Sequence, residues 1–288
     1  MTAEPTLITG AGGQLGHDLS QLLPHARALG RGALDITDQV QLESALAGVE
    51  TVFNCAAYNA VDRAEEDSAG ADLVNHLGPA RLARQCQQSG IRLIHFSTNY
   101  VFDGRASSAY SEADEPSPVG AYAQSKRAGE EAVLRECPGA LVVRSSGLFG
   151  AVGSAVKGGS FPERIVASAR AGRDLAVVGD QRLNPTWTGD LAAASLVIAR
   201  SGLTGIVHLV ADGCASYFEL AVATLELAGL QHVPVREVTS DAYPTAAPRP
   251  QNGCLTSNRV PSLPHWRQGL AGYWAAYQLM SPANEQPM

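Results

Sequence analysis

A glycine-spaced turn near the start of the chain constrains the fold more than any other feature of the sequence. Glycines stand at positions 10, 13 and 16 of the run Thr9–Gly16, after an apolar segment and before an amphipathic one. A strand, a tight turn and a helix in this order can place backbone N–H groups and a helix N-terminus against a dinucleotide pyrophosphate. Gly10 would allow the sharp turn, Gly13 the approach of backbone to phosphate, and Gly16 the packing of helix on strand. An ordinary tight turn is the alternative explanation.

Short apolar runs alternate with longer amphipathic stretches over the first half of the chain. The expected strands are 6–9, 26–29, 52–54, 93–97 and 141–143. This alternation predicts an α/β fold, a Rossmann-type doubly wound parallel sheet with ligands at the carboxyl ends of its strands. We expect residues 1–150 to form the dinucleotide-binding domain. Residues 151–288 are expected to form mainly a smaller C-terminal substrate-binding lobe, with some segments returning to the main sheet.

The second half of the chain has a looser pattern. We expect a glycine-rich loop to Gly159, helices at 161–171, 188–201 and 216–228, a strand at 206–210, a proline-rich loop at 244–250 and a frayed end at 281–288. The acidic run 62–67 is interpreted as a solvated helix start.

Composition excludes several classes of protein. The 288 residues are 45% hydrophobic and carry a net charge of −7 without a basic block, which argues against nucleic acid or an anionic membrane as partner. The start of the chain has no basic segment before an apolar one, and no apolar run is long enough to cross a bilayer, so we expect a cytoplasmic monomer or homodimer. We expect no metal site, and we interpret the scattered cysteines as reduced packing residues: Cys55, Cys86, Cys137, Cys214 and Cys254.

The second expected strand ends near Arg31, where NAD-preferring proteins usually offer a carboxylate to the ribose. A guanidinium suits a 2′-phosphate, so NADPH is the expected cofactor and NADH the alternative; a solvated loop arginine explains Arg31 equally well. Asp35 could accept a hydrogen bond from the adenine amino group, or could cap a helix with Thr37 and Asp38. The other cofactor-binding candidates are Gly10, Gly12, Gly13, Gln14, Leu15, Gly16, Ile36, Cys55, Ala56, Ala57, Tyr58, Asn75, Ser97, Tyr122 and Lys126.

Tyr122 and Lys126 are the best indication of chemistry. Their spacing brings the two side chains onto one face of a helix, so that the ammonium could favour the phenolate. A charge at about 4 Å in an effective dielectric of about 20 supplies at most ~4 kcal/mol, which would lower the tyrosine pKa toward the working range of a general acid. A surface pair without function is the alternative.

Six segments of the chain resemble one family in particular. The chain is similar to the extended short-chain dehydrogenase/reductases and, within them, to the dTDP-4-dehydrorhamnose reductase group. The similar segments are Asn54–Glu65, Ile94–Gly104, Tyr122–Glu130, Arg144–Gly150, Gly179–Thr186 and Arg249–Leu255.

The resemblance implies a reaction and a set of roles. Hydride would pass from NADPH to C4 of a nucleotide-activated 4-keto-6-deoxyhexose, with Tyr122 donating the proton. Thr98 would bind the substrate carbonyl region, and Lys126 would hold the nicotinamide ribose and tune Tyr122. Arg249 is expected on the nucleotide diphosphate, with a structural role on a loop carbonyl as the alternative. The remaining substrate-binding candidates are Val61, Asn99, Tyr100, Phe102, Gly147 and Phe161.

Two positions depart from the family pattern. Asn99 stands where members commonly carry Asp, and Gly147 where they carry Trp, which would remove an aromatic wall from the sugar or base pocket. Two other functions remain open. One is a sugar-nucleotide epimerase of the same superfamily. The other is a non-catalytic NADP-binding protein resembling the regulatory subunit of methionine adenosyltransferase.

Overall fold

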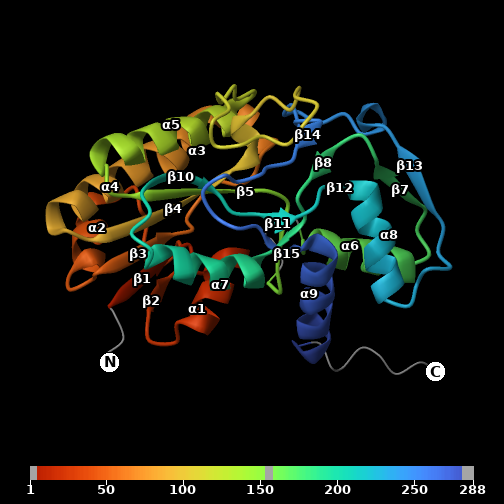
Figure 1. Ribbon diagram of the computed structural model, residues 1–288, viewed down its shortest axis with the longest axis horizontal. Helices are drawn as coiled ribbons and strands as arrows, with labels where there is room; N and C mark the ends of the chain where they lie inside the picture. Colours follow the sequence, from red (N-terminus) through yellow and green to blue (C-terminus); the bar gives the residue numbers. More distant parts are fainter. Residues whose placement is uncertain (1–4, 153–157, 281–288) are drawn as a thin grey trace.

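A six-stranded parallel sheet forms the centre of the computed structural model, which describes residues 5–152 and 158–280 (Figure 1). The strands follow the order β10-β5-β4-β3-β1-β2, and every neighbouring pair is parallel. They are β1 (Thr6–Thr9), β2 (Arg27–Leu29), β3 (Thr51–Asn54), β4 (Arg92–Thr98), β5 (Leu141–Ser145) and β10 (Gly205–His208). The predicted doubly wound sheet is confirmed.

Helices cover both faces of the sheet because both faces of its strands are apolar. Successive residues point to opposite faces, so Leu7 and Val52 join one core while Ile8 and Phe53 join the other. Over the first face lie α2 (Gln39–Leu46), α4 (Gly78–Ser89) and α5 (Ala121–Glu136), and over the second α1 (Gln14–Leu22) and α7 (Thr188–Ala199) (Figure 1).

The direction in which successive strands are added to the sheet reverses after β2. From β1 the chain runs outward to β2 and then returns to β3 on the other side of β1, which opens a crevice at their carboxyl ends. Short helical segments follow β3 and β4 at this edge: η1 (Arg63–Glu65), α3 (Ser68–Asp72), the π-helix η2 (Leu73–Leu77) and η3 (Asn99–Val101). This edge carries the candidate site.

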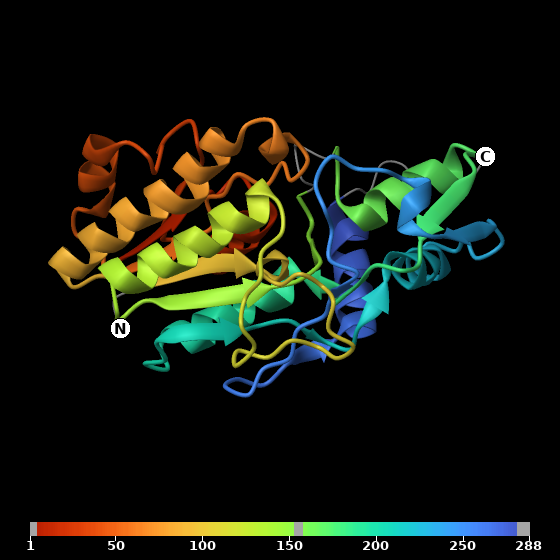
Figure 2. The same cartoon turned by 90° about the horizontal axis from the view of Figure 1, so that it is seen from above.

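A second lobe lies beyond the ends to which the strand arrows point (Figure 2). Its helices are α6 (Phe161–Arg170), α8 (Tyr217–Leu227), α9 (Trp266–Met280) and η4 (Ser240–Ala242). Short strands pair as β12 (Ala215–Ser216)-β8 (Arg182–Leu183)-β14 (Asn252–Gly253), β13 (Val235–Val238)-β7 (Leu175–Val178), β11 (Ala211–Asp212)-β15 (Leu263–His265) and β6 (Leu148–Phe149)-β9 (Thr186–Trp187). Helix α9 was not predicted from the sequence, although it brings Trp266, Tyr273 and Trp274 into the core of the lobe.

The expectation that all five cysteines are reduced is wrong. Cys214 and Cys254 form a disulfide with their Cα atoms 6.0 Å apart, whereas Cys55, Cys86 and Cys137 are free. The two partners lie 40 residues apart in sequence. They meet because β12 and β14 both pair with β8, a topology that cysteine spacing does not reveal.

Three expectations concern parts of the chain outside the described residues or need revision. The glycine-rich loop before Gly159 falls partly on residues 153–157, and the expected frayed end is 281–288; both lie outside the description. The acidic run is more than a solvated helix start, because Asp67 caps α3 and Asp62 pairs with Arg249.

Among residues 5–152 and 158–280, no helix is long and apolar enough to cross a membrane.

Candidate active site

A crevice of about 310 Å³ lies at the carboxyl ends of β1 and β3. Its lining includes ten of the predicted cofactor residues: Gly10, Gly12, Gly13, Arg31, Asp35, Ile36, Cys55, Ala56, Ala57 and Tyr58. Leu34, Asn59 and Val74 complete it. The loops after three strands thus converge on one elongated site.

The glycines of this crevice have the packing that a phosphate-binding turn needs. Gly10 has φ +66°, and a Cβ there would lie 2.6 Å from the backbone nitrogen of Ala56. A Cβ at Gly16 would lie 2.4 Å from the Gly10 carbonyl oxygen, so α1 packs directly on the turn, while Gly12 has no neighbour within 4 Å of that position. The first turn of α1 has no acidic residue. The crevice therefore borders the residues that lead into the N-terminus of α1, a position that favours a pyrophosphate.

Arg31 and Asp35 lie together at the β2 end of the crevice. Asp35 accepts hydrogen bonds from the backbone nitrogen and hydroxyl of Thr37, at 2.9 and 2.7 Å, and these bonds lower its pKa. The N-cap of α2 is Asp38, which accepts from Val40 and Gln41. The guanidinium is thus the cationic group that the crevice offers at this end.

Other cofactor candidates lie elsewhere. Leu15 is buried in the core under the glycine turn, and Gln14 and Ser97 line the neighbouring cavity. Asn75 lies behind the crevice, where its side chain bonds both the nitrogen and the oxygen of Tyr58 at 2.9 and 3.0 Å. Asn75 therefore fixes the loop that follows β3 instead of lining the crevice.

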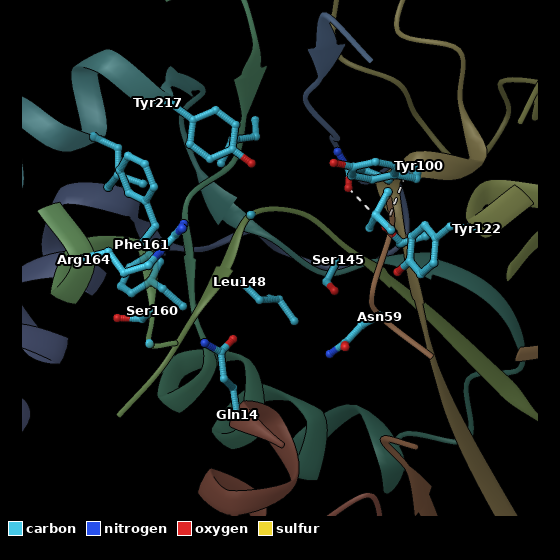
Figure 3. A pocket seen from close by; sticks show the side chains of 18 of the residues that line it. Gln14, Asn59, Tyr100, Tyr122, Ser145, Leu148, Ser160, Phe161, Arg164 and Tyr217 are labelled. Carbon is cyan, nitrogen blue, oxygen red and sulfur yellow. Dashed lines mark hydrogen bonds between the residues drawn. The ribbon is translucent and has the colours of Figure 1, made fainter. Parts of the chain in front are cut away.

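A second cavity of about 260 Å³ adjoins the first at Asn59 and separates the sheet edge from the lobe (Figure 3). Tyr100, Tyr122 and Ser145 lie on the sheet side, and Phe161, Arg164 and Tyr217 face them from the lobe (Figure 3). Of the predicted substrate residues, six line this cavity: Val61, Thr98, Asn99, Tyr100, Gly147 and Phe161.

Thr98 and Tyr122 meet at the floor of the cavity. Tyr122 lies in the first turn of α5, and its ring meets that of Tyr100 edge-on with centroids 5.6 Å apart. Burial raises the pKa of Tyr122 to about 12, while its hydrogen bond with Thr98 acts in the opposite direction. The expectation that Lys126 lowers this pKa is wrong, because burial has the largest influence and the influence that opposes it comes from Thr98.

Lys126 is buried one turn further along α5. Its Nζ donates a hydrogen bond to the Phe96 carbonyl at 2.7 Å. Burial lowers the pKa of Lys126 to about 8, against the opposing influence of Glu130. Glu130 in turn binds Arg144 through two hydrogen bonds of 2.8 and 2.7 Å, in a pair that is fully buried. This ion pair fixes α5 against β5 directly behind Lys126.

Two predicted substrate residues do not line the cavity. Phe102 is a core residue, stacked on Tyr110 with centroids 4.3 Å apart, so the expectation that it contacts substrate is wrong. Arg249 donates to both oxygens of Asp62, at 2.9 and 2.7 Å, and to the Ala247 carbonyl at 3.1 Å. Its fork of donors is therefore engaged within the protein, as in the structural alternative.

Gly147 does not leave the gap that the missing Trp would suggest. Gly147 has φ +59°, and a Cβ there would lie 2.1 Å from Leu183 Cδ1 and 2.7 Å from the Asn184 carbonyl oxygen. Leu183 and Asn184 therefore close this side of the cavity, and the backbone conformation favours glycine.

The lobe contributes residues that sequence analysis missed, including Ser160, Arg164 and Tyr217. Helices α6 and α8 both begin at the cavity, and each has a capping box, Ser160 with Glu163 and Ser216 with Glu219. Both helices were predicted from the sequence, and the pattern S-x-x-E at each start could have identified the serine as the cap. In the described part of the chain, no group of three or more His, Cys, Asp or Glu residues could hold a metal ion.

The fold and the two adjoining sites define an α/β protein that places a Tyr–Lys pair and a threonine beside a dinucleotide crevice, the class of the short-chain dehydrogenase/reductases. Residues 4–279 match the family model described as RmlD substrate binding domain, and the chain belongs to that family.

Known proteins similar to this chain agree with that assignment. This chain is 41% identical to the dTDP-4-dehydrorhamnose reductase of Mycobacterium tuberculosis, over 98% of this chain and 94% of the relative. It is 37% identical to the dTDP-4-keto-6-deoxy-D-glucose reductase of Streptomyces niveus, over 85% and 86% of the two chains. The solved structure of dTDP-4-dehydrorhamnose reductase from Bacillus anthracis in complex with NADP matches with a TM-score of 0.89 at 30% identity, covering 95% of this chain and 99% of that one.

Proposed function

We propose that the protein is an NADPH-dependent reductase of the C4 keto group of a nucleotide-activated 6-deoxy-4-keto-hexose. The observation that carries the proposal is that Thr98 and Tyr122 meet in a cavity adjoining the dinucleotide crevice, with Lys126 buried one turn further along α5. The reductases named among the relatives act on substrates of this kind by their names.

Tyr122 is the proton donor of the proposed reaction. A pKa near 12 keeps the phenol protonated at neutral pH, so the proton is present when negative charge develops on the C4 oxygen. Thr98 then stabilises the phenolate by a hydrogen bond, and the Lys126 ammonium, one turn further along α5, would balance the negative charge once it forms. The nicotinamide supplies the hydride when bound. Thr98 and Lys126 are buried, and Tyr122 is half-buried at the cavity.

The residues of the crevice fit a phosphorylated dinucleotide. Gly12, Gly13 and the N-terminus of α1 would hold the pyrophosphate, and Arg31 would bind the 2′-phosphate that distinguishes NADPH from NADH. On the substrate side, Arg164 is the better candidate for the nucleotide diphosphate, because it lines the cavity and Arg249 does not.

An assay that follows the oxidation of NADPH tests the proposal. Purified protein with a freshly made dTDP-4-keto-6-deoxyhexose should oxidise NADPH, and NADH should give a lower kcat/KM because it lacks the phosphate that Arg31 binds. Tyr122→Phe should lower kcat by about 100-fold or more, the size of a general-acid contribution. Its dissociation constant for NADPH should change little.

Tyr110→Phe provides the control, since Tyr110 is a buried tyrosine whose hydroxyl bonds Asp103 outside the cavity. This variant should keep turnover. If the wild-type protein binds NADPH but oxidises none with any 4-keto sugar nucleotide, the reductase assignment is wrong and a binding protein is favoured.

A further inference from the structure

Asn99 lies at the point where the end of β4 meets the lobe. Its side-chain Nδ2 donates to the Gly253 carbonyl of β14 at 3.0 Å, and its Oδ1 accepts from the Thr98 hydroxyl at 3.3 Å. The side chain is buried, and it also lines the substrate cavity. One amide therefore joins a strand of the lobe to a residue of the candidate active site.

The direction of both hydrogen bonds follows from the chemistry of their partners. A carbonyl can only accept, so Gly253 fixes the NH₂ group of Asn99 toward β14 and turns the amide oxygen toward Thr98. Thr98 has one proton, and Asn99 Oδ1 accepts it, while the oxygen of Thr98 accepts from the Tyr100 backbone nitrogen at 3.2 Å. The second lone pair of Thr98 is thereby left for the Tyr122 phenol.

The contact on the β14 side is tightly packed. A Cβ at Gly253 would lie 2.2 Å from Asn99 Nδ2, so a residue with a side chain would displace the amide. The same carbonyl accepts from Ser146 Oγ at 2.9 Å, and the next residue, Cys254, is tied to Cys214. Asn99 therefore meets a carbonyl that β8, Ser146 and the disulfide hold in place.

We propose that Asn99 is a positioning residue: its amide transmits the position of β14 to the hydroxyl of Thr98 and sets the direction in which that hydroxyl donates. This role rests on the proposed reductase function. Before proton transfer, the Thr98 proton is held by Asn99 and Tyr122 keeps its own proton. After transfer, the long bond to Asn99 can be exchanged for one to the Tyr122 phenolate.

An ionised aspartate cannot make both of the hydrogen bonds that Asn99 makes in this chain. It has no proton for the Gly253 carbonyl, so two acceptor oxygens would face each other, and it would hold the Thr98 proton more strongly. A protonated aspartic acid can reproduce both bonds, with its O–H toward Gly253 and its C=O toward Thr98. Asn99→Asp should therefore gain a pH dependence that the wild type lacks.

The test is kcat/KM of Asn99→Asp relative to wild type between pH 5 and 7.5. We expect values within about threefold at pH 5 and a loss of at least tenfold, roughly the loss of one buried hydrogen bond, at pH 7.5. The titratable groups around Asn99 are the same in both proteins, so the ratio to wild type isolates position 99. Tyr100 from η3 and Tyr122 from α5 have raised pKa values, Lys126 from α5 has a pKa of about 8, β8 contributes Arg182, and Cys254 from β14 is in the disulfide.

Asn252→Asp is the matched control. Asn252 is on the same strand, and its Nδ2 also donates to carbonyls, those of Ala106 and Ser108 at 2.9 and 2.6 Å, but it does not contact Thr98. The ratio of its kcat/KM to that of the wild type should not change between pH 5 and 7.5. If this ratio changes for both variants, or if Asn99→Asp has a flat ratio to wild type, the positioning role is wrong.

Thermal unfolding separates this proposal from the reductase assignment. The pKa of an aspartic acid at position 99 is raised by folding, so its stabilising bond is present below the unfolded pKa of about 3.9 and is lost as pH rises through the folded value. The Tm deficit of Asn99→Asp should grow from pH 5 to 7.5, even in a protein that turns over no sugar nucleotide. If Asn99→Asp has the Tm of the wild type at every pH, the hydrogen bond from position 99 to the Gly253 carbonyl does not stabilise the fold, and the proposal is wrong.

Discussion

Lys126 carries its charge in a place where charged groups are costly. Its Nζ is surrounded by protein and donates to one backbone carbonyl, with the Glu130–Arg144 pair one turn away. Burial disfavours the ammonium, and Glu130 only partly compensates, so the pKa falls to about 8. The residue that would hold the ribose is therefore close to losing its proton at ordinary pH.

This pKa predicts an alkaline limit of activity. Lys126 is charged below pH about 8 and neutral above it, so the ammonium that supports the phenolate is present on the acid side and lost as pH rises. We expect kcat/KM to fall by about tenfold per pH unit above that value. Measuring kcat/KM from pH 6 to 10 checks this. Lys126→Met should have a low kcat/KM at every pH and should not show the additional fall above pH 8. A wild-type profile that is flat to pH 9.5 would contradict the assignment to Lys126.

At the residue scale, sequence patterns located groups better than they described their surroundings. The spacing of Tyr122 and Lys126 predicted that both lie on one face of a helix, and this is confirmed. Their pKa values depend on burial by β4, η3 and the lobe, which no local pattern contains. The ion pair of Arg249 with Asp62 likewise joins residues 187 positions apart.

At the element scale, the cavity wall on the lobe side depends on where α6 and α8 begin. Each helix starts with a serine whose hydroxyl accepts from the backbone nitrogen three residues on, and a glutamate that accepts from the serine nitrogen. Phe161 and Tyr217 directly follow these caps and point into the cavity. The caps therefore set the position of two aromatic side chains relative to substrate.

The two cap serines differ in one side-chain contact, which gives a matched pair of variants. Ser216→Ala should lower the free energy of unfolding by about 1 kcal/mol, the usual cost of losing a cap. Ser160→Ala should cost about 2 kcal/mol, because Ser160 Oγ also hydrogen-bonds the buried Tyr273 hydroxyl at 2.9 Å. Urea denaturation measures both values. Equal losses would mean that the Tyr273 contact contributes nothing.

At the scale of the whole molecule, the disulfide closes a large loop within the lobe. Cys214 and Cys254 are 40 residues apart, and a crosslink over a loop of that length stabilises the folded state by about 4 kcal/mol in the chain-entropy description. The bond holds β12 and β14 beside β8, and β14 provides the carbonyl that Asn99 contacts.

Thiol counting tests this bond directly. The unfolded, unreduced protein should react with an alkylating reagent at three cysteines, and the reduced protein at five, since the free residues are Cys55, Cys86 and Cys137. Mass spectrometry of the alkylated chain gives both counts. Five reactive thiols without reduction would show that the pair is open.

The main sheet could be predicted from the sequence because each of its strands is an apolar run between recognisable helices. In the lobe, helices α6 and α8 were predicted close to their observed bounds. The strand pairing of the lobe could not be predicted, because several of its strands are only two residues long and pair with partners distant in sequence. Helix α9 was not predicted, although Trp266, Tyr273 and Trp274 are buried in the lobe core. Short strands carry too little periodic signal to identify their partners.

The core beneath the glycine turn combines residues from nearly the full length of the chain. Ile8 of β1 packs in the same cluster as Leu191 of α7, Val207 of β10 and Leu263 of β15. During synthesis on the ribosome, the first strand therefore emerges long before its last packing partner exists. The dinucleotide crevice is formed early in the sequence, but the support beneath it is complete only when almost the whole polypeptide has been made.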